Sequence, residues 1–144
     1  MNASPALSDK HRDYGLLILR IGIGLMFVVV HGFPKVAGGS QTWEGLGKSM
    51  AVFGIEFAPT FWGFMATVSE FLGGMCLITG ILFRPACALM TFTMFMAVMA
   101  NFRGGYGLAS QPLELCILFL SLIFTGAGNL TIPKLLWQIR QQTL

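Results

Sequence analysis

Four long apolar stretches constrain the fold of this chain more than any other feature of its sequence. They occupy most of the 144 residues and cover positions 15–33, 59–82, 86–102 and 113–127. A helix that crosses the hydrocarbon core of a bilayer needs about 20 mainly apolar residues, and about 17 are tolerated. The pattern therefore predicts an integral membrane protein with four spanning helices and the lipid bilayer as its solvent.

Composition supports one membrane domain. The chain is 55% hydrophobic and 10% charged, which leaves too few polar side chains to cover a soluble domain of this length. The net charge of +3 is spread over the predicted helix ends, which argues against nucleic-acid binding. We expect a cytoplasmic N-terminal tail at 1–13, a membrane domain at 14–132 and a C-terminal interfacial tail at 133–144. No small-residue cleavage site follows the first apolar run, so we expect a retained helix.

Prolines and glycines set the predicted helix boundaries. We expect the first span to end near Pro34, the second to begin at Pro59, and the fourth to begin at Pro112 and stop within 126–128. The short segment 82–85 predicts a tight hairpin between the second and third spans. The expected fold is all-α, a four-helix membrane bundle.

The loop between the first two spans carries a further helical pattern. Four apolar residues recur at helical spacing opposite Glu44 and Lys48, namely Trp43, Leu46, Met50 and Phe53. This pattern predicts an external amphipathic helix that lies on the membrane interface. A lid over the bundle is the alternative interpretation.

Charge distribution predicts the orientation. An even number of spans puts both termini on one side. With the 82–85 turn, that side carries five cations, Lys10, Arg12, Arg84, Lys134 and Arg140, against Lys35, Lys48 and Arg103 on the other. Since cytoplasmic segments carry the excess of Lys and Arg, we expect both termini in the cytoplasm.

Ionisable residues inside the apolar stretches are the candidate functional residues. They are Arg20, His31, Glu70 and Glu114. A charge at the centre of a spanning helix costs about 2.5–3.5 kcal/mol on insertion scales, so each of these residues needs a partner or a function.

Depth and periodicity predict an outer polar cluster. His31, Asn101 and Glu114 reach the same leaflet, with Lys35 above them. Helical periodicity puts three sets of residues each on one helix face: Arg20, Gly24, Phe27 and His31 on the first span, Met90, Met94, Ala97 and Asn101 on the third, and Glu114, Ser121 and Thr125 on the fourth. We expect these three faces to point inward, because lipid offers no hydrogen-bond partner. A histidine beside a carboxylate can exchange protons near neutral pH. A hydrogen-bonded helix cap is the alternative interpretation.

Arg20 and Glu70 suggest an intramembrane salt bridge. Side chains lean toward the N-terminus of their own helix, which sends Arg20 inward and Glu70 outward, so a direct pair requires favourable rotamers or a bridging water. Thr125 and the last carbonyls of the fourth span compete for Arg20, and snorkelling to the headgroups is a further alternative. Glu70 is too short to snorkel, so we expect it to be paired, protonated or functional.

The remaining signals favour packing over chemistry. Cys76, Cys87 and Cys116 have no CxxC spacing, so we expect buried thiols and no metal site. Small residues recur along the second span at Ser69, Gly73, Cys76 and Gly80, which predicts a close helix contact.

Jointly, these residues resemble the DoxX family of small four-helix membrane proteins. The resemblance covers about 14–132. It rests on LLILRIGIGLMFVVVHGFPKV with Arg20, His31 and Lys35, on SEFLGGMCLITGILFRP with Glu70 and Arg84, and on PLELCILFLSLIFTGAGNLTI with Glu114. The family is associated with membrane oxidoreductase systems, including thiosulfate:quinone oxidoreductase subunits. The resemblance thus implies a bacterial inner-membrane protein linked to redox chemistry.

Three functions remain open from the sequence. The first is a membrane subunit of an oxidoreductase that docks a quinone or a redox enzyme through Arg20, His31, Lys35, Glu70, Asn101 and Glu114. The second is a non-catalytic scaffold for such an enzyme. The third is a small-molecule carrier, which four short helices without an inverted repeat make hard to build. The narrow interior of so small a bundle makes partners or a homo-oligomer plausible.

Overall fold

The computed structural model describes residues 5–102 and 104–142, and this part of the chain is helical without strands. Its elements are α1 (Pro5–Met26), the π-helical segment η1 (Phe27–Gly32), α2 (Phe33–Ala37), α3 (Gly39–Gly47), the 3-10 segment η2 (Lys48–Phe53), α4 (Pro59–Thr79), α5 (Phe83–Phe102), α6 (Tyr106–Thr125) and α7 (Ile132–Gln142).

Four helical segments of the described chain are long and apolar enough to cross a membrane. They are Asp9–Ala37, Pro59–Thr79, Phe83–Phe102 and Tyr106–Thr125. The predicted all-α fold with four spanning helices is therefore confirmed. The bilayer is the environment that these surfaces require, because no other solvent accepts so much exposed apolar area.

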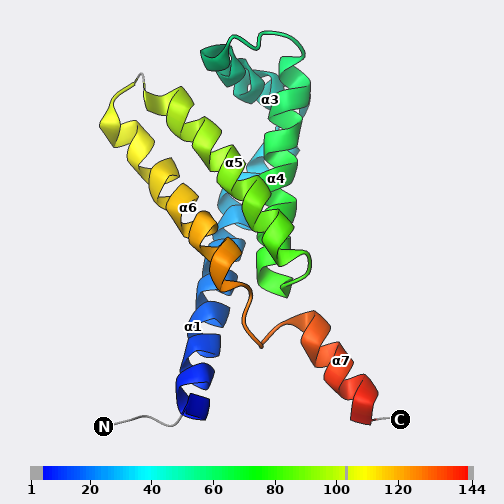
Figure 1. The fold of residues 1–144 in the computed structure, drawn as a ribbon. Helices are drawn as coiled ribbons and strands as arrows, with labels where there is room; N and C mark the ends of the chain where they lie inside the picture. The colour runs from blue at the N-terminus through cyan, green and yellow to red at the C-terminus, as the bar shows by residue number, and fades with distance from the viewer. Residues whose placement is uncertain (1–4, 103, 143–144) are drawn as a thin grey trace.

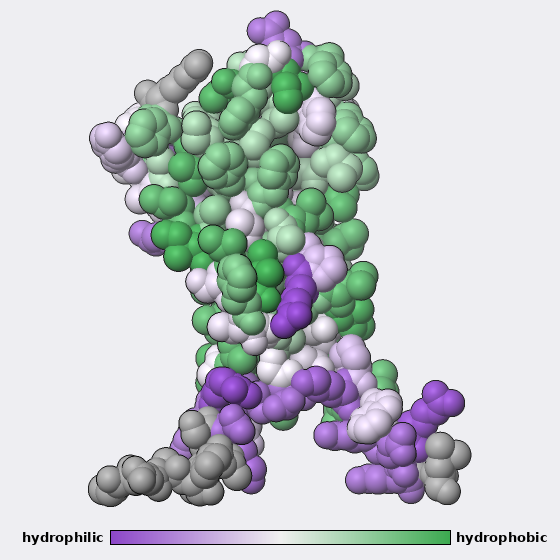
Figure 2. Space-filling model, viewed as in Figure 1, coloured by the Kyte–Doolittle hydropathy of each residue, from purple (hydrophilic) through white to green (hydrophobic). Residues whose placement is uncertain are grey.

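The helices alternate in direction between two ends of the molecule. Both termini and the α4–α5 turn lie toward one end, here called the terminal end, and α3 and the α5–α6 turn lie at the other, the loop end (Figure 1). Among the spanning helices, α1 packs on α4, α4 packs on α5 and α5 packs on α6. Hydrophobic residues cover the body, and hydrophilic residues gather at the terminal end (Figure 2).

The first span is longer than expected. The prediction that it ends near Pro34 is wrong, because helical structure continues through η1 and α2 to Ala37. In the wide π-helical turn, the Phe33 N–H bonds to the carbonyl of Val28, five residues earlier. Pro34 then lies in the first turn of α2, where its missing N–H is tolerated.

The fourth span also begins earlier than expected. The prediction of a start at Pro112 is wrong, because α6 begins at Tyr106, directly after Gly105 with its φ of 107°. Pro112 lies inside this helix, and spanning helices tolerate such a proline when local adjustments satisfy the freed carbonyl. The predicted starts and stops at Pro59, 82–85 and 126–128 are confirmed, since α4 begins at Pro59, α5 follows the turn and α6 ends at Thr125.

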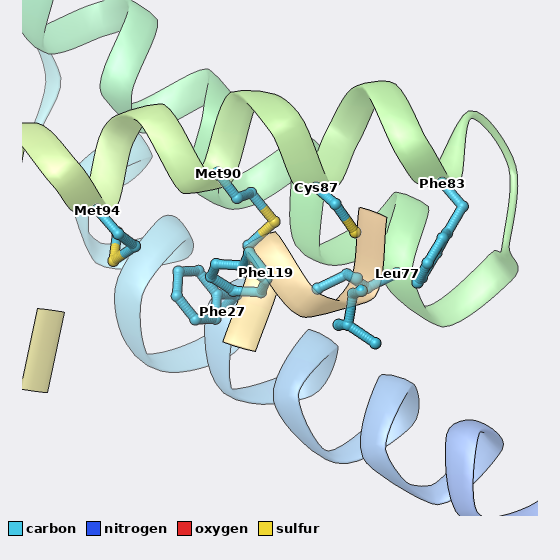
Figure 3. Packing of buried hydrophobic residues seen from close by; sticks show 8 residues of the cluster. Phe27, Leu77, Phe83, Cys87, Met90, Met94 and Phe119 are labelled. Atoms are coloured by element: carbon cyan, nitrogen blue, oxygen red, sulfur yellow. The ribbon is translucent and has the colours of Figure 1, made fainter. Parts of the chain in front are cut away.

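The core lies where α1, α4, α5 and α6 converge. Its buried side chains are Phe27, Leu77, Phe83, Cys87, Met90, Met94, Phe119 and Leu122 (Figure 3). The rings of Phe27 and Phe119 meet edge to face with centroids 5.1 Å apart, which joins α6 to the first span.

Small residues let α4 approach its neighbours, as predicted. A Cβ placed on Gly73 would lie 2.7 Å from the Met90 side chain of α5, and one on Gly74 would lie 2.9 Å from the Gly24 carbonyl of α1. A larger residue at either position would push a helix away. Of the three cysteines, Cys87 is buried, as expected, whereas Cys76 and Cys116 are only partly buried.

Candidate functional site

An ion pair between Lys35 and Glu70 is the main polar feature inside the bundle. The Lys35 ammonium, on α2, donates a hydrogen bond to Oε2 of Glu70, on α4. The Glu70 side chain is 6% exposed and that of Lys35 is 23% exposed. A carboxylate so deeply buried requires a partner of opposite charge, and Lys35 supplies it.

A largely apolar cavity of 510 Å³ opens beside this ion pair. Its size lies within the range of about 300–1,000 Å³ that is typical of small-molecule sites. Polar groups enter it from Lys35, Glu70 and Asn101. Its apolar wall is made mainly by side chains of η2, α4 and α5, including Met50, Phe61, Trp62, Met65, Phe92 and Met96.

The α3 helix and η2 close one side of this cavity. Gly63 of α4 lies so close to the Trp43 backbone that a Cβ on Gly63 would lie 1.7 Å from the Trp43 carbonyl oxygen. The Trp43 indole packs edge to face on Phe64 at 5.0 Å and donates a 2.9 Å hydrogen bond to the Lys35 carbonyl. The predicted helix in this loop is present, and its packing on α4 favours the lid interpretation.

Two hydroxyls tie the cavity walls together. Thr93 of α5, which lines the cavity, donates a 2.8 Å hydrogen bond to the Ser69 hydroxyl of α4. This bond lies one residue from Glu70. It fixes α5 against α4, so the wall that carries Asn101 holds its position relative to the ion pair.

Arg20 does not belong to this site. Its side chain is 1% exposed and donates to backbone carbonyls in the last turn of α4 and in the segment that follows α6. The acceptors are Leu77 at 3.1 Å, Ile78 at 3.4 Å, Leu130 at 3.0 Å and also Ala127. The Arg20 guanidinium carbon lies 5.8 Å from the centre of the Phe83 ring.

The predicted Arg20–Glu70 salt bridge is therefore wrong. Each group has another partner, because Arg20 lies near the terminal end and Lys35 reaches Glu70 from the loop end. Snorkelling of Arg20 is wrong as well, since its side chain is buried. The competing interpretation was closer, because the carbonyls of Ala127 and Leu130 directly follow α6.

The predicted outer cluster does not form in the described part of the chain. His31 is half-buried, and its ring lies against Phe27 at 5.0 Å, without a hydrogen bond or an ion pair. Glu114 is exposed on α6 and likewise has no hydrogen bond or ion pair there. Asn101 lines the cavity instead.

The expectation that Glu114, Ser121 and Thr125 face inward is also wrong. All three are exposed, whereas Phe119 and Leu122 of the same helix are buried. The two hydroxyls are satisfied within α6, since Ser121 donates to the Ile117 carbonyl and Thr125 to the Ser121 carbonyl. Such local bonds allow hydroxyl groups to face lipid.

Comparison with known proteins bears on the same segment. The family model for DoxX matches residues 15–102, more than half of the chain. The chain belongs to the DoxX family. The match covers every candidate residue of this DoxX protein except Glu114, and thus the whole Lys35–Glu70 cavity. No curated protein and no solved structure matches the chain significantly.

Sequence reasoning missed the aromatic wall of this cavity. Phe61 and Trp62, in the first turn of α4, and Phe92 of α5 all line it. Aromatic residues near a membrane surface are common interfacial anchors, so their presence alone does not indicate a ligand. The sequence signal that could have located this cavity was the pair of ionisable residues Lys35 and Glu70 on the first two spans.

Proposed function

We propose that this DoxX protein is the membrane subunit of an oxidoreductase system and that its Lys35–Glu70 cavity binds the ring of a quinone. The observation that carries this proposal is the buried ion pair at the edge of a 510 Å³ cavity with an aromatic wall. A quinone has a flat apolar ring and two polar carbonyl oxygens. The cavity offers both surfaces that such a ring needs.

Each polar group has a role in this proposal. The Lys35 ammonium donates a hydrogen bond to one quinone carbonyl, while Glu70 keeps the ammonium in position. The Asn101 amide, which lines the same cavity, offers a second donor. Reduction of a quinone to a quinol takes two electrons and two protons. We assign the electrons to a partner redox enzyme. Lys35 gives one proton to the carbonyl oxygen that it faces, and water at the loop end supplies the second proton and reprotonates Lys35.

Tryptophan fluorescence tests this proposal in purified protein. Trp62 lines the cavity, so a short-chain quinone should quench its emission in a saturable way. Lys35→Met should weaken quinone binding about tenfold, because a hydrogen bond to a charged group contributes about 1.5–3 kcal/mol. Trp137 is replaced by Phe, whereas Trp43 is kept because its indole donates to the Lys35 carbonyl. A Trp62→Phe variant then shows how much of the quenching comes from Trp62.

The matched control is Lys48→Met. Lys48 lies in the same loop region and pairs with Glu44 at 2.9 Å, but it does not line the cavity. Its removal should leave quinone affinity unchanged. Absence of saturable quenching, or equal affinity in the wild type and Lys35→Met, would contradict the proposal.

The scaffold function is the second candidate, and the exposed face of α6 favours it. Gly107, Glu114 and Ser121 recur at seven-residue spacing on this face, a repeat typical of left-handed helix pairs. An exposed carboxylate within a spanning helix calls for a polar partner in the membrane. We propose that a membrane-bound redox enzyme or a second copy docks there.

We further propose a bacterial inner-membrane location with both termini in the cytoplasm. The loop end carries Lys35 and Lys48, and Arg103, the third cation at that end, lies outside the described residues. The terminal end carries five cations, namely Lys10, Arg12, Arg84, Lys134 and Arg140. This excess of Lys and Arg favours the cytoplasmic side for the terminal end.

A further inference from the structure

A second pocket lies at the terminal end, on the opposite half of the molecule from the Lys35–Glu70 cavity. It has a volume of 570 Å³ and lies between α1, the α4–α5 turn, the segment 126–131 and α7. Three cationic side chains line it, namely Arg12, Arg84 and Lys134. Cations from three separate elements thus surround one hollow.

Among the three cations that line the pocket, Arg84 has no partner in the described part of the chain. It is exposed at the start of α5 and makes no hydrogen bond or ion pair with residues 5–102 or 104–142. Its Nη2 lies 3.8 Å from the position of a Cβ built on Gly126. The guanidinium therefore lies against the backbone that lines the pocket, with its donors available.

The other two cations lie at the rim of the pocket and each has a partner. Lys134 donates to the Gly128 carbonyl at 3.0 Å and to the Asn129 side-chain oxygen at 2.7 Å. Arg12 lies 3.4 Å from Asp9, but both side chains are largely exposed, so water screens that pair.

The buried Arg20 adds positive charge beneath the pocket. A Cβ on Gly80, which lines the pocket, would lie 3.6 Å from Nη1 of Arg20. In the described chain Arg20 donates only to backbone carbonyls, and no carboxylate pairs with it. Carbonyl dipoles solvate a guanidinium but leave its full charge in place. An anion in the pocket would compensate this charge.

The nearby carboxylates do not neutralise the positive charge around the pocket. Asp13 accepts hydrogen bonds from the Asn129 backbone and side chain, at 3.0 and 2.9 Å, and Asp9 faces Arg12. Asp13 holds α1 to the segment after α6 and lies beside Gly128. Four cations and two carboxylates surround the pocket, which leaves an excess of positive charge.

We propose that this pocket binds the phosphate group of an acidic phospholipid. The apolar body of the molecule gives way to hydrophilic residues at this end, as Figure 2 shows, so the pocket lies at the depth of lipid headgroups. Arg84 offers the planar set of donors that suits a phosphate oxygen pair. The neighbouring α7 exposes Leu135, Leu136 and Trp137, side chains suited to the interface where such a lipid lies.

Native mass spectrometry of the protein released from detergent micelles tests this proposal. The probes are phosphatidylglycerol and, as the zwitterionic comparison, phosphatidylcholine. Arg84→Gln should raise the dissociation constant for phosphatidylglycerol about fivefold, since one basic residue near an anionic headgroup contributes about 1 kcal/mol. Phosphatidylcholine carries the same phosphodiester, but the cations of the pocket repel its choline group, so it should bind more weakly and change less in Arg84→Gln. Arg84→Lys should retain most of the affinity, because it keeps the charge.

Lys10→Gln is the matched control. It removes one exposed positive charge from the same end of the molecule, but Lys10 does not line the pocket. Equal affinity in the wild type and Arg84→Gln, or an equal loss in Lys10→Gln, would overturn the proposal. Inorganic phosphate provides a further arm. If inorganic phosphate displaces phosphatidylglycerol at matched concentration, the site takes a free anion and the lipid assignment is wrong.

Discussion

Arg20 and Glu70 are both buried ionisable residues of the membrane domain, but they differ in their surroundings and therefore in whether they can contact a ligand. Arg20 is fully enclosed and bound to backbone carbonyls, so it stabilises the fold and acts on the terminal-end pocket only through its charge. Glu70 borders a cavity and is bound to a lysine that is partly accessible. A side chain that borders an open cavity can meet a ligand, whereas an enclosed one cannot. Hence the quinone proposal rests on Glu70 and Lys35 rather than on Arg20.

At the scale of single residues, we predict that Arg20 stabilises the fold without affecting quinone binding. Arg20→Lys keeps the positive charge but loses the planar set of donors that joins the ends of α4 and α6. We expect the free energy of unfolding to fall by about 2–3 kcal/mol, since hydrogen bonds from a charged group are lost. Denaturant titration in detergent measures this loss. A weaker quinone affinity in the folded variant would contradict the assignment.

At the scale of helices, the sequence predicted which residues share a face better than which way that face points. On the first and third spans the predicted faces point inward, with Arg20 and Phe27 buried on one and Met90 and Met94 on the other. On α6 the same reasoning failed, because periodicity does not tell whether a polar face is covered by the chain itself or by another molecule.

Helix boundaries explain why the ion pair was not predicted. If the first span ends near Pro34, Lys35 belongs to a loop above the membrane domain. The π-helical turn carries the helix past Pro34, and this continuation brings Lys35 to Glu70. Such a turn depends on the tertiary packing around Phe27 and Gly32, which no local sequence signal reveals.

For α6, we predict that Glu114 serves association rather than folding. Glu114→Leu removes an exposed carboxylate without a described partner, so the free energy of unfolding should change by less than about 0.5 kcal/mol. The complex extracted with mild detergent should become smaller, which blue native electrophoresis can measure. Leu113→Ala, at an exposed apolar position of the same helix, is the control. An unchanged complex size in Glu114→Leu would favour lipid contact for this face.

At the scale of the whole molecule, the arrangement of spans follows from the sequence, but the orientation needs measurement. Four apolar stretches and the hairpin at 82–85 suffice to place both termini at one end, as Figure 1 shows. The two pockets were not predictable in this way. Each pocket is formed by segments that are distant in the chain, and their meeting depends on packing angles rather than on periodicity.

We predict that the terminal end faces the cytoplasm. In a variant without native cysteines, Ser40→Cys at the loop end should react with a membrane-impermeant maleimide in intact cells. Lys10→Cys at the terminal end should react only after lysis. Ser40 is preferable to Gly39, whose φ of 60° would strain a side chain. The reverse labelling pattern would exchange the two sides and place the pocket lined by Arg12, Arg84 and Lys134 outside.

Photolabelling with an azido-quinone in native membranes tests the central claim most directly, because it identifies where the ring binds. We expect the label on the cavity-lining segments, which are 46–50 of α3 and η2, 61–70 of α4 and 89–101 of α5, and we expect excess unlabelled quinone to prevent it. Ala66→Trp should fill the cavity and abolish the label. Ala88→Trp, at an exposed position of α5 outside the cavity, should not. Label confined to other helices, or unchanged in Ala66→Trp, would contradict a quinone site beside Lys35 and Glu70.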